Sequence, residues 1–460
     1  MTRVAVVGGG ITGLAAAWEL LASGAEVAVL EAGSRLGGRI LTEEVAGRRI
    51  DLGPDAFLAR VPHALDLCRE LGLEGEIVHP AADGASIWSG NRLRPLPSGL
   101  VLGAPTGIPD LAALVRAGLV SRTGAARAAL DLVRPATSFG PDPSVGEVVG
   151  RRLGREVFRA VVDPLVGGIH AGSSVRLSAR AAAPQLADGA RSRSLMLGLR
   201  AAPRAAREVS LTGTGAAGAA PAPAPLFASV GGGLGRLVEA LEVRLRDGGA
   251  ALSTGVAVDT VPVPGYDASV VATPAPVTAR LVGAASPDAA ADLRAIEYSS
   301  VALAVLVYPT TALGRALEGT GFLVPAAEGR LLTACSFGSA KWPHWAAPGD
   351  LVLRASAGRS GDERALNLGD TELVERLHDE LAAALGLLRG PRATRVTRWE
   401  QAFPQYRPGH LDRVARAETA VARDIPGVTI AGAGYRGVGI AACIAQGRSA
   451  ARQALAVARP

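Results

Sequence analysis

Residues 4–40 read VAVVGGGITGLAAAWELLASGAEVAVLEAGSRLGGRI, and this stretch decides the fold. A valine-rich run leads into a glycine turn, an Ala/Leu-rich segment with helical spacing, and a second apolar run that ends at Glu31. This order predicts a strand, a turn, a helix and a second strand. In such a unit Gly8 makes the tight turn, Gly10 lets the backbone approach a pyrophosphate, and Gly13 allows close packing of helix on strand. The free N–H groups at the helix start and the Glu31 carboxylate then suit the pyrophosphate and ribose of a dinucleotide.

A glycine turn alone is weak evidence, because such turns also occur in βαβ units that bind nothing. Here the strand, the helix and the acidic residue are all in place, which favours a dinucleotide site. The continuation RLGGRI, with Gly37, Gly38 and Arg39, resembles that of the glutathione-reductase-like FAD proteins rather than that of plain NAD dehydrogenases. FAD is therefore the expected cofactor.

A second strand, glycine turn and helix are predicted over residues 427–458, GVTIAGAGYRGVGIAACIAQGRSAARQALAVA. A helix that opens at GVGI (437–440) aims its backbone donors and the positive end of its dipole at one locus, which suits the anion of a reduced flavin. The alternative is a glycine turn that serves only packing. The flavin interpretation is favoured, because the first unit already requires a cofactor.

The composition limits the class of protein. A chain of 460 residues with 48% hydrophobic residues is expected to form two or three domains. Cys68, Cys335 and Cys443 have no CxxC or metal-like spacing, so we expect buried free thiols, no disulfide framework and no metal site. No signal peptide and no uninterrupted apolar run of about 18 residues is present, which predicts a cytoplasmic protein, with peripheral membrane contact as the alternative.

The net charge of +6 is unevenly placed. Residues 111–210 hold 15 arginines and 7 acidic residues, so this segment is more basic than the rest of the chain. A basic segment suggests an anionic partner, which could be an acidic substrate, an anionic membrane surface or an acidic protein. An ordinary solvated helical face explains the same charge equally well.

The middle of the chain alternates between helical and strand patterns. ASIWSGNRLRPLP (85–97) predicts a hairpin that turns at Ser89, Gly90 and Asn91, and several helices are expected over 110–165. The Ala/Gly/Pro-rich segment 187–225 predicts a mobile loop. Two strands at 251–261 and 268–277 are expected to return to the first sheet, and the apolar runs between 301 and 358 to form a separate one.

Motifs along most of the chain resemble the flavoprotein oxidases of haem biosynthesis, the protoporphyrinogen and coproporphyrinogen oxidase family. The first two motifs are shared by many flavin amine oxidases, whereas the later ones are more specific to this family. The matching segments are GGGITGLAAAWEL, EAGSRLGGRI, DLGPDAFL, DPLVGGIHAG with LSARAAAPQL, SVGGGLGRLVEAL, GFLVP with LLTACSFGSAKWPHW, RWEQAFPQYRPGH and YRGVGI.

The resemblance implies a set of site residues. FAD is expected on Gly8, Gly10, Ile11, Thr12, Gly13, Glu31, Ala32, Arg39, Gly53, Pro54, Asp55, Ala56, Val258, Trp399, Val438, Gly439 and Ile440. The substrate macrocycle is expected in a cavity over the flavin. The candidates for its lining are Arg60, Gly167, Gly168, Ile169 and His170, with none of them assigned as a catalytic base.

The resemblance also implies an α/β architecture. A Rossmann-like FAD-binding domain, glutathione-reductase-like and of the amine-oxidase type, is joined by an α+β substrate domain and an inserted helical lobe. The predicted boundaries are 1–60, 225–290 and 395–460 for the discontinuous FAD-binding domain, 61–100 and 291–394 for the substrate-binding domain, and 101–224 for the helical lobe.

The implied activity is the oxygen-linked, six-electron oxidation of coproporphyrinogen III to coproporphyrin III, by hydride transfer to the flavin with release of hydrogen peroxide. The alternatives are a protoporphyrinogen IX oxidase, a flavin amine oxidase or polyene desaturase, and a non-catalytic FAD- and porphyrin-binding protein. The expected partners are the porphyrinogen and molecular oxygen, with ferrochelatase contact and peripheral membrane contact left open and no nucleic acid. Either a monomer or a homodimer is expected.

Overall fold

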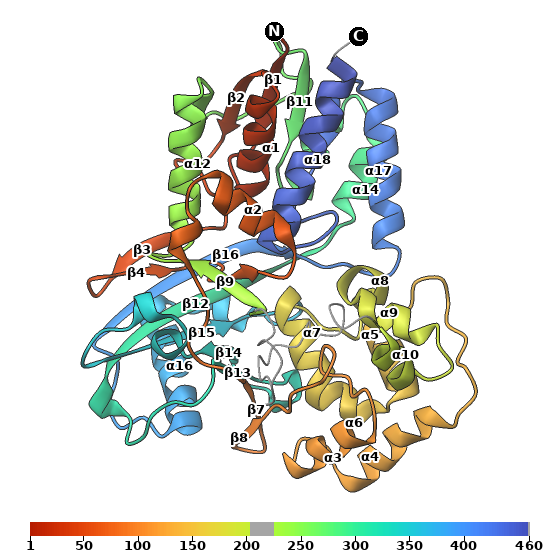
Figure 1. Cartoon of the computed structure of the whole chain (residues 1–460), viewed down its shortest axis with the longest axis vertical. Helices are drawn as coiled ribbons and strands as arrows, with labels where there is room; N and C mark the ends of the chain where they lie inside the picture. The colour runs from red at the N-terminus through yellow and green to blue at the C-terminus, as the bar shows by residue number, and fades with distance from the viewer. Residues whose placement is uncertain (203–224, 459–460) are drawn as a thin grey trace.

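The computed structural model describes residues 1–202 and 225–458. They form three lobes: a sheet flanked by helices, a second sheet, and a group of short helices (Figure 1). The prediction of a mobile loop over 187–225 is wrong for residues 187–202, because α9 (Pro184–Ala190) and α10 (Leu195–Ala201) occupy most of them. The remainder of that predicted loop, 203–224, lies outside the described residues.

The first lobe is built on a five-stranded, wholly parallel sheet in the order β10-β2-β1-β11-β17. Its strands come from three distant parts of the chain, which confirms the prediction that the chain returns to this sheet. They are β1 (Arg3–Val7), β2 (Glu26–Glu31), β10 (Ala251–Thr254), β11 (Ala268–Val271) and β17 (Val428–Ile430). Because both faces are covered, the central strands are continuous apolar runs.

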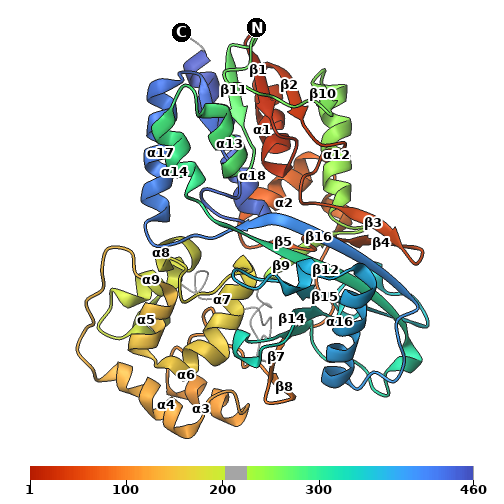
Figure 2. The ribbon, with the colours of Figure 1, turned by 180° about the vertical axis from the view of Figure 1, so that it is seen from behind.

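Successive side chains of β1 enter different cores, as the pleat requires. Val4 and Val6 pack with α1, α12 and α18 on one face, and Ala5 and Val7 pack with α13, α14 and α17 on the other. Figure 2 shows these helices around the sheet. The helices are α1 (Ile11–Ala22), α12 (Gly235–Asp247), α13 (Ala275–Val282), α14 (Pro287–Arg294), α17 (His410–Asp424) and α18 (Ile440–Ala458).

The segment after residue 61 packs on this first lobe rather than on the second sheet. Leu67 and Cys68 of α2 (Pro62–Glu70) are buried in the same core as α1 and α18. β9 (Phe227–Val230) pairs with β5 (Phe57–Leu58) and with β6 (Ile77–Val78). The segment from α2 to β6 therefore belongs with the first lobe, and not with the second sheet as the predicted boundary at residue 61 implies. The reason is that the apolar face of α2 packs on the nucleotide-binding lobe.

The second lobe is a seven-stranded sheet in the order β16-β12-β15-β14-β13-β7-β8. Its strands are β7 (Ser86–Ser89), β8 (Arg92–Pro95), β12 (Tyr298–Pro309), β13 (Gly321–Leu323), β14 (Leu332–Ser336), β15 (Asp350–Ala357) and β16 (Ala393–Pro404). The predicted separate sheet is confirmed, and so is the β7–β8 hairpin, whose Asn91 has a φ of +59°. Four leucines of α16 (Asp370–Leu385) are buried in the core on this sheet.

β16 departs from the predicted boundary at residue 395. It pairs antiparallel with β12 from Ala393 to Pro404, so the chain leaves the second sheet only after Pro404. A pairing between segments separated by about a hundred residues is set by tertiary packing, which local sequence patterns do not record.

Short helices form the third lobe, as predicted for 110–165. They are α3 (Ile108–Arg116), α4 (Arg122–Ala129), α5 (Val145–Arg152), α6 (Arg155–Val157), α7 (Asp163–His170), α8 (Ala179–Ala182), α9 and α10. Asp131 and Arg152 form a fully buried ion pair in this lobe. The second oxygen of Asp131 accepts hydrogen bonds from Ser194 Oγ and Met196 N, which fixes the start of α10 and explains why this segment is helical. Among the described helices none is long and apolar enough to cross a membrane.

The hairpin of β3 (Thr42–Val45) and β4 (Arg48–Asp51) ends at a buried carboxyl group. One oxygen of Asp51 accepts a hydrogen bond from Thr42 Oγ1. The same oxygen accepts a second one, at 2.9 Å, from Leu234 N at the start of α12. The second oxygen has no partner within the described part of the chain. Burial, opposed by the Thr42 hydrogen bond, raises the pKa of Asp51 to about 7.

This carboxyl group predicts a pH dependence of stability. The unfolded chain releases the Asp51 proton near pH 3.9, whereas the folded chain holds it until about pH 7. Between these values the folded state binds more protons, so the free energy of unfolding falls as pH rises, by about 1.4 kcal/mol for each tenfold difference in proton affinity. Asp51→Asn keeps an oxygen acceptor and removes the titration. The difference in thermal midpoint between pH 4.5 and pH 7.5 should therefore shrink in calorimetry.

The matched control is Asp188→Asn, because the Asp188 side chain is 70% exposed in α9. It should retain the wild-type pH dependence. An Asp51→Asn protein whose thermal midpoint varies with pH as steeply as the wild type would contradict the assignment.

Candidate active site

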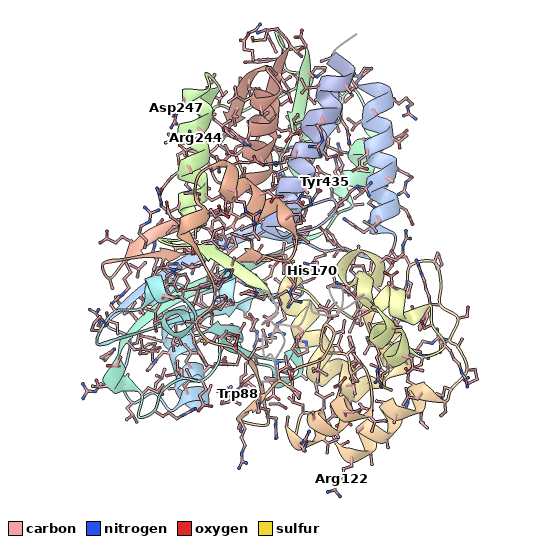
Figure 3. All side chains as sticks on the ribbon, in the orientation of Figure 1. Trp88, Arg122, His170, Arg244, Asp247 and Tyr435 are labelled. Carbon is pink, nitrogen blue, oxygen red and sulfur yellow. The ribbon has the colours of Figure 1, made fainter. Side chains whose placement is uncertain are left out.

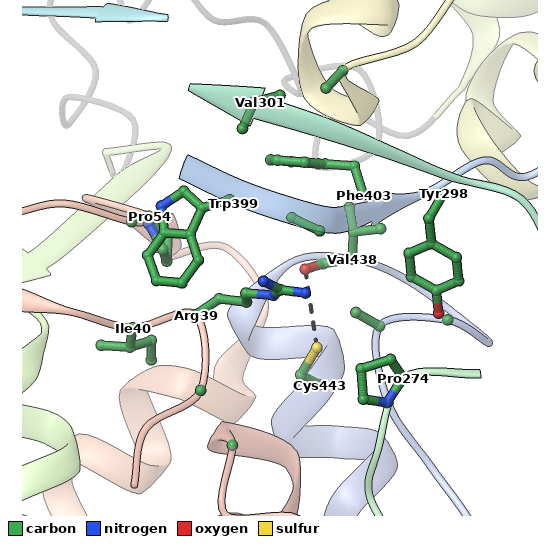
Figure 4. Close-up of a pocket in the computed structure, with 18 of the residues that line it drawn as sticks. Arg39, Ile40, Pro54, Pro274, Tyr298, Val301, Trp399, Phe403, Val438 and Cys443 are labelled. Atoms are coloured by element: carbon green, nitrogen blue, oxygen red, sulfur yellow. Dashed lines mark hydrogen bonds between the residues drawn. The ribbon is translucent and has the colours of Figure 1, made fainter. Parts of the chain in front are cut away.

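A cavity of about 850 Å³ lies at the carboxyl ends of the parallel strands, where doubly wound sheets bind their ligands. It extends from the first glycine turn, past the start of α18, to the face of α7 and the second sheet. All three lobes therefore contribute to its lining. Figure 4 shows part of this lining, including Arg39, Trp399, Tyr298 and Phe403.

The first glycine turn has the backbone geometry that the sequence predicts. Gly8 has a φ of +105°, and a Cβ on Gly13 would lie 1.9 Å from the Gly8 carbonyl oxygen, so neither position accepts another residue. A Cβ on Gly10 would have more room, because the nearest atom, Gly38 Cα, would lie 3.9 Å from it. α1 begins at Ile11 without a side-chain cap, so its first N–H groups face the cavity as donors for an anion. This arrangement fits a pyrophosphate.

Glu31 is held at the end of β2 by two backbone donors. Its carboxylate accepts hydrogen bonds from Gly9 N and Gly33 N, each at 2.7 Å, and the residue lines the cavity together with Ala32. Each carboxylate oxygen can accept more than one hydrogen bond, so ribose hydroxyls can still bind here. Val258 also lines the cavity, but it lies in an irregular segment after β10 and not in the predicted strand.

Arg39 connects the nucleotide-binding lobe to β16. Its guanidinium donates hydrogen bonds to the carbonyl oxygens of Glu400, at 3.2 Å, and Gln401, at 3.0 Å. It lies 5.6 Å from the centre of the Trp399 ring, and Figure 4 shows the two side chains near each other. The Trp399 indole N–H donates to Leu52 O at 2.7 Å. Both predicted residues line the cavity, and burial lowers the pKa of Arg39.

Three of the four residues predicted in the GPDA turn line the cavity, namely Gly53, Pro54 and Ala56. Asp55 does not: it points into a buried cluster and accepts hydrogen bonds from Lys341 Nζ at 2.9 Å and Trp342 Nε1 at 2.8 Å. Burial alone raises the pKa of Asp55, but Arg354, 3.1 Å away, and Lys341 outweigh it and hold this pKa below its usual range. Asp55 therefore fixes the turn from behind and is not among the described residues that line the cavity.

The start of α18 faces the same cavity, which is lined by Val438, Gly439 and Ile440, the three residues predicted to contact the cofactor. Tyr406 fixes this turn, because its hydroxyl donates to Ala433 O at 2.6 Å and accepts from Gly437 N at 2.9 Å. Figure 4 shows the Cys443 thiol below the turn, directed at the Val438 carbonyl.

The predicted substrate residues divide into two groups. Gly167 and Gly168 of α7 line the cavity, where a Cβ on Gly168 would lie 3.6 Å from Leu323 Cδ2 of β13. Ile169 does not line it, because it is on the outer face of α7 and 38% exposed. His170 is buried away from the cavity with its ring 5.4 Å from that of Tyr406, and burial lowers its pKa to about 4, so it is neutral at pH 7. Figure 3 shows its position between the lobes.

Arg60 is half-buried and is not among the described residues that line the cavity, in contrast to its prediction as a substrate contact.

Several lining residues were not predicted, because they belong to the second sheet or to the turn after β15. The sheet residues are Tyr298, Leu323, Thr333, Arg354, Ser356 and Phe403, and the turn residue is Arg359. A signal for two of them exists: Arg354 and Ser356 are polar residues two apart in the otherwise apolar strand LVLRASA, so they share one face of β15. That spacing indicates a polar face of β15, but the sequence does not show that this face lines a cavity.

Residues 11–455 match the family of flavin-containing amine oxidoreductases. The chain belongs to this family. Coproporphyrinogen III oxidase of Bacillus subtilis is 34% identical over 98% of both chains, and that of Mycobacterium tuberculosis is 35% identical over 96% of this chain and 95% of the relative. Protoporphyrinogen oxidase of Bos taurus is 30% identical over 98% of both.

Solved structures support the same assignment. A putative protoporphyrinogen oxidase from Exiguobacterium sp. 255-15 superposes with a TM-score of 0.83 at 28% identity and covers 98% of each chain. A reduced UDP-galactopyranose mutase, with a TM-score of 0.72 at 16% identity, covers 100% of this chain and 97% of its own and shares the fold. The protein is thus an oxidoreductase of a flavin-containing family, and both the resemblance and the predicted fold class are confirmed.

The Glu31 hydrogen bonds predict a loss of cofactor. Glu31→Arg removes the acceptor for Gly9 N and Gly33 N and places a cation where the ribose is predicted to bind. The purified variant should retain only a minor fraction of the wild-type flavin, measured as flavin absorbance per polypeptide.

Glu26→Arg is the matched control, because Glu26 lies at the other end of β2, is 53% exposed and pairs with Arg3. The Glu26→Arg protein should retain the wild-type amount of flavin. Full flavin content in Glu31→Arg would remove Glu31 from the cofactor site.

Proposed function

We propose that the protein catalyses the FAD-dependent, oxygen-linked oxidation of coproporphyrinogen III to coproporphyrin III. Six electrons and six protons leave the porphyrinogen in three two-electron steps, and three molecules of oxygen become three of hydrogen peroxide. The observation that carries the proposal is one cavity that joins a dinucleotide-type turn to an apolar end between α7 and the second sheet. The relatives named coproporphyrinogen III oxidase span nearly the whole chain and support it.

FAD, rather than a flavin mononucleotide, suits the length of the site. Gly10, Glu31 and Val258 line one part of the cavity, and Val438 to Ile440 line another at the start of α18. A mononucleotide would leave the glycine turn and the Glu31 carboxylate without a ligand. When bound, FAD supplies the hydride acceptor and passes the electrons on to oxygen.

The residues at the apolar end orient the substrate and exclude water. Gly168 leaves room for a flat ring, and Leu323, Val301 and Phe403 offer apolar walls for the macrocycle. Fixing a substrate close to its hydride acceptor lowers the barrier through proximity. The first N–H groups of α18 and the positive end of its dipole stabilise the negative charge that accumulates on reduction.

Protoporphyrinogen IX is the second candidate substrate, because the bovine relative carries that activity in its name and covers the chain to the same extent. It has two propionates and two vinyl groups where coproporphyrinogen has four propionates. The two substrates therefore differ in charge and not in the ring that is oxidised.

Finer partner assignments are also proposals. Exposed arginines gather on the helical lobe, where Figure 3 shows Arg122 at the tip directed away from the molecule. Together with Arg116 on α3, it offers a basic surface for an acidic protein that receives the porphyrin, such as a ferrochelatase, or for an anionic membrane.

Turnover tests the proposal directly. The wild-type protein is supplied under air with coproporphyrinogen III, protoporphyrinogen IX or a simple primary amine. We expect porphyrin fluorescence to rise fastest with coproporphyrinogen III, with three hydrogen peroxide molecules for each porphyrin. Absence of flavin reduction by coproporphyrinogen III without oxygen would disprove the activity, and faster turnover of an amine would assign the site to amine oxidation.

Filling the apolar end of the cavity should block the substrate and spare the cofactor. Gly168→Leu places a branched side chain next to Leu323 in a helix that tolerates leucine. We expect kcat/KM for the porphyrinogen to fall by about tenfold or more, a loss of about 1.4 kcal/mol or more, with unchanged flavin absorbance.

Gly150→Leu is the control, since a Cβ there meets nothing within 4 Å and Gly150 lies on α5, outside the cavity lining. It should behave as wild type. Wild-type kinetics in Gly168→Leu would show that the substrate does not bind next to α7.

A further inference from the structure

Arg359 is a cation of the cavity whose guanidinium has no hydrogen-bond or ion-pair partner among residues 1–202 and 225–458. It lines the cavity directly after β15 and Gly358. A half-buried guanidinium without a partner is costly, so its presence calls for a ligand of opposite charge.

The turn that carries Arg359 is fixed on both sides. Ser360 N donates to Ala171 O, at the end of α7, at 2.8 Å, and Asp362 N donates back to Arg359 O at the same distance. Gly358 has a φ of +92°, and a Cβ there would lie 2.9 Å from Ser300 O of β12. The base of the Arg359 side chain is thus held between the second sheet and the helix whose glycines line the apolar end.

The two acidic residues that interact electrostatically with Arg359 are hydrogen-bonded to other donors. Asp362 accepts two hydrogen bonds from the Arg364 guanidinium, each at 2.8 Å. Asp163 accepts from Ser174 N at 2.9 Å and from Ser174 Oγ at 2.8 Å. Burial lowers the pKa of Arg359, and the two carboxylates only partly oppose this.

The other arginines of the cavity are engaged or are exposed. Arg39 is bonded to backbone carbonyls, and Arg354 is paired with Asp55. Arg280 is exposed on α13, which packs against the nucleotide-binding sheet. Among the described residues, this leaves Arg359 as the partly buried cation of the cavity that is available to an anionic ligand.

We propose that Arg359 binds a propionate carboxylate of the porphyrinogen and determines the preference for carboxylate-bearing substrates. This inference rests on the proposed function. A guanidinium offers two parallel N–H donors that match a carboxylate, and such charge-assisted pairs are among the strongest hydrogen bonds in proteins. The apolar walls bind the ring, and Arg359 orients it by one edge.

Binding of the product separates charge recognition from catalysis. Coproporphyrin III and its uncharged tetramethyl ester are titrated into the flavin-loaded protein, and porphyrin fluorescence reports binding. Arg359→Gln should weaken coproporphyrin III binding by roughly ten- to a hundredfold, with little change for the ester. Arg359→Lys should recover part of the lost affinity, because an ammonium supplies the positive charge but not the two parallel N–H donors of a guanidinium.

Arg376→Gln is the control for a lost positive charge, because Arg376 is 58% exposed on α16 and outside the cavity. It should bind both ligands as wild type does. If Arg359→Gln leaves coproporphyrin III binding unchanged, or weakens the ester equally, the inference is wrong.

Kinetics distinguish this inference from the proposed function. If the wild type fails to oxidise coproporphyrinogen III, the proposed function is wrong whatever the variants do. If the wild type turns over and Arg359→Gln raises KM while largely keeping kcat, the positioning role stands. If wild type and variant share one KM, only the role of Arg359 is lost.

Discussion

The close backbone contact between α1 and its neighbours is the constraint on which the site depends. A Cβ on Gly447 of α18 would lie 2.1 Å from Thr12 O, and a Cβ on Gly13 would lie 1.9 Å from Gly8 O. α1 is therefore pressed between β1 and α18 at distances that only glycine permits. Because of this packing, the starts of both helices open into one cavity, where their unpaired N–H groups attract negative charge from two directions.

The rest of the cavity is held together by buried charge. Asp55 binds Lys341, Trp342 and Arg354, and Arg354 also donates to Gly53 O at 2.7 Å. These contacts join the GPDA turn to the second sheet from behind. Removing one partner of such a cluster leaves an uncompensated buried charge, so the cluster specifies one position of the turn more than it adds stability. Lys341, the one lysine in the sequence, is used for this purpose.

The sequence was informative where a local pattern carried the geometry, and misleading where a distant segment set it. The glycine turns, the strands of both sheets and the return of the chain to the first sheet follow from spacing and strand-forming composition. The inward turn of Asp55 depends on Lys341, which lies 286 residues away. The burial of His170 depends on Tyr406, and the order of α10 depends on Asp131. The cavity face of β15 carries Arg354, but only the fold shows what that face meets.

The order of the strands also has a consequence for synthesis of the protein. β1 is made first, but its sheet is completed at one edge by β17, and the outer face of α1 is covered by α18 (Figure 1). A ribosome that has not yet translated 428–458 carries a chain whose first apolar surfaces are uncovered, a state prone to aggregation. The starts of α1 and α18, which both line the cavity, can therefore come together only after that segment has emerged, so the cavity is completed late in synthesis.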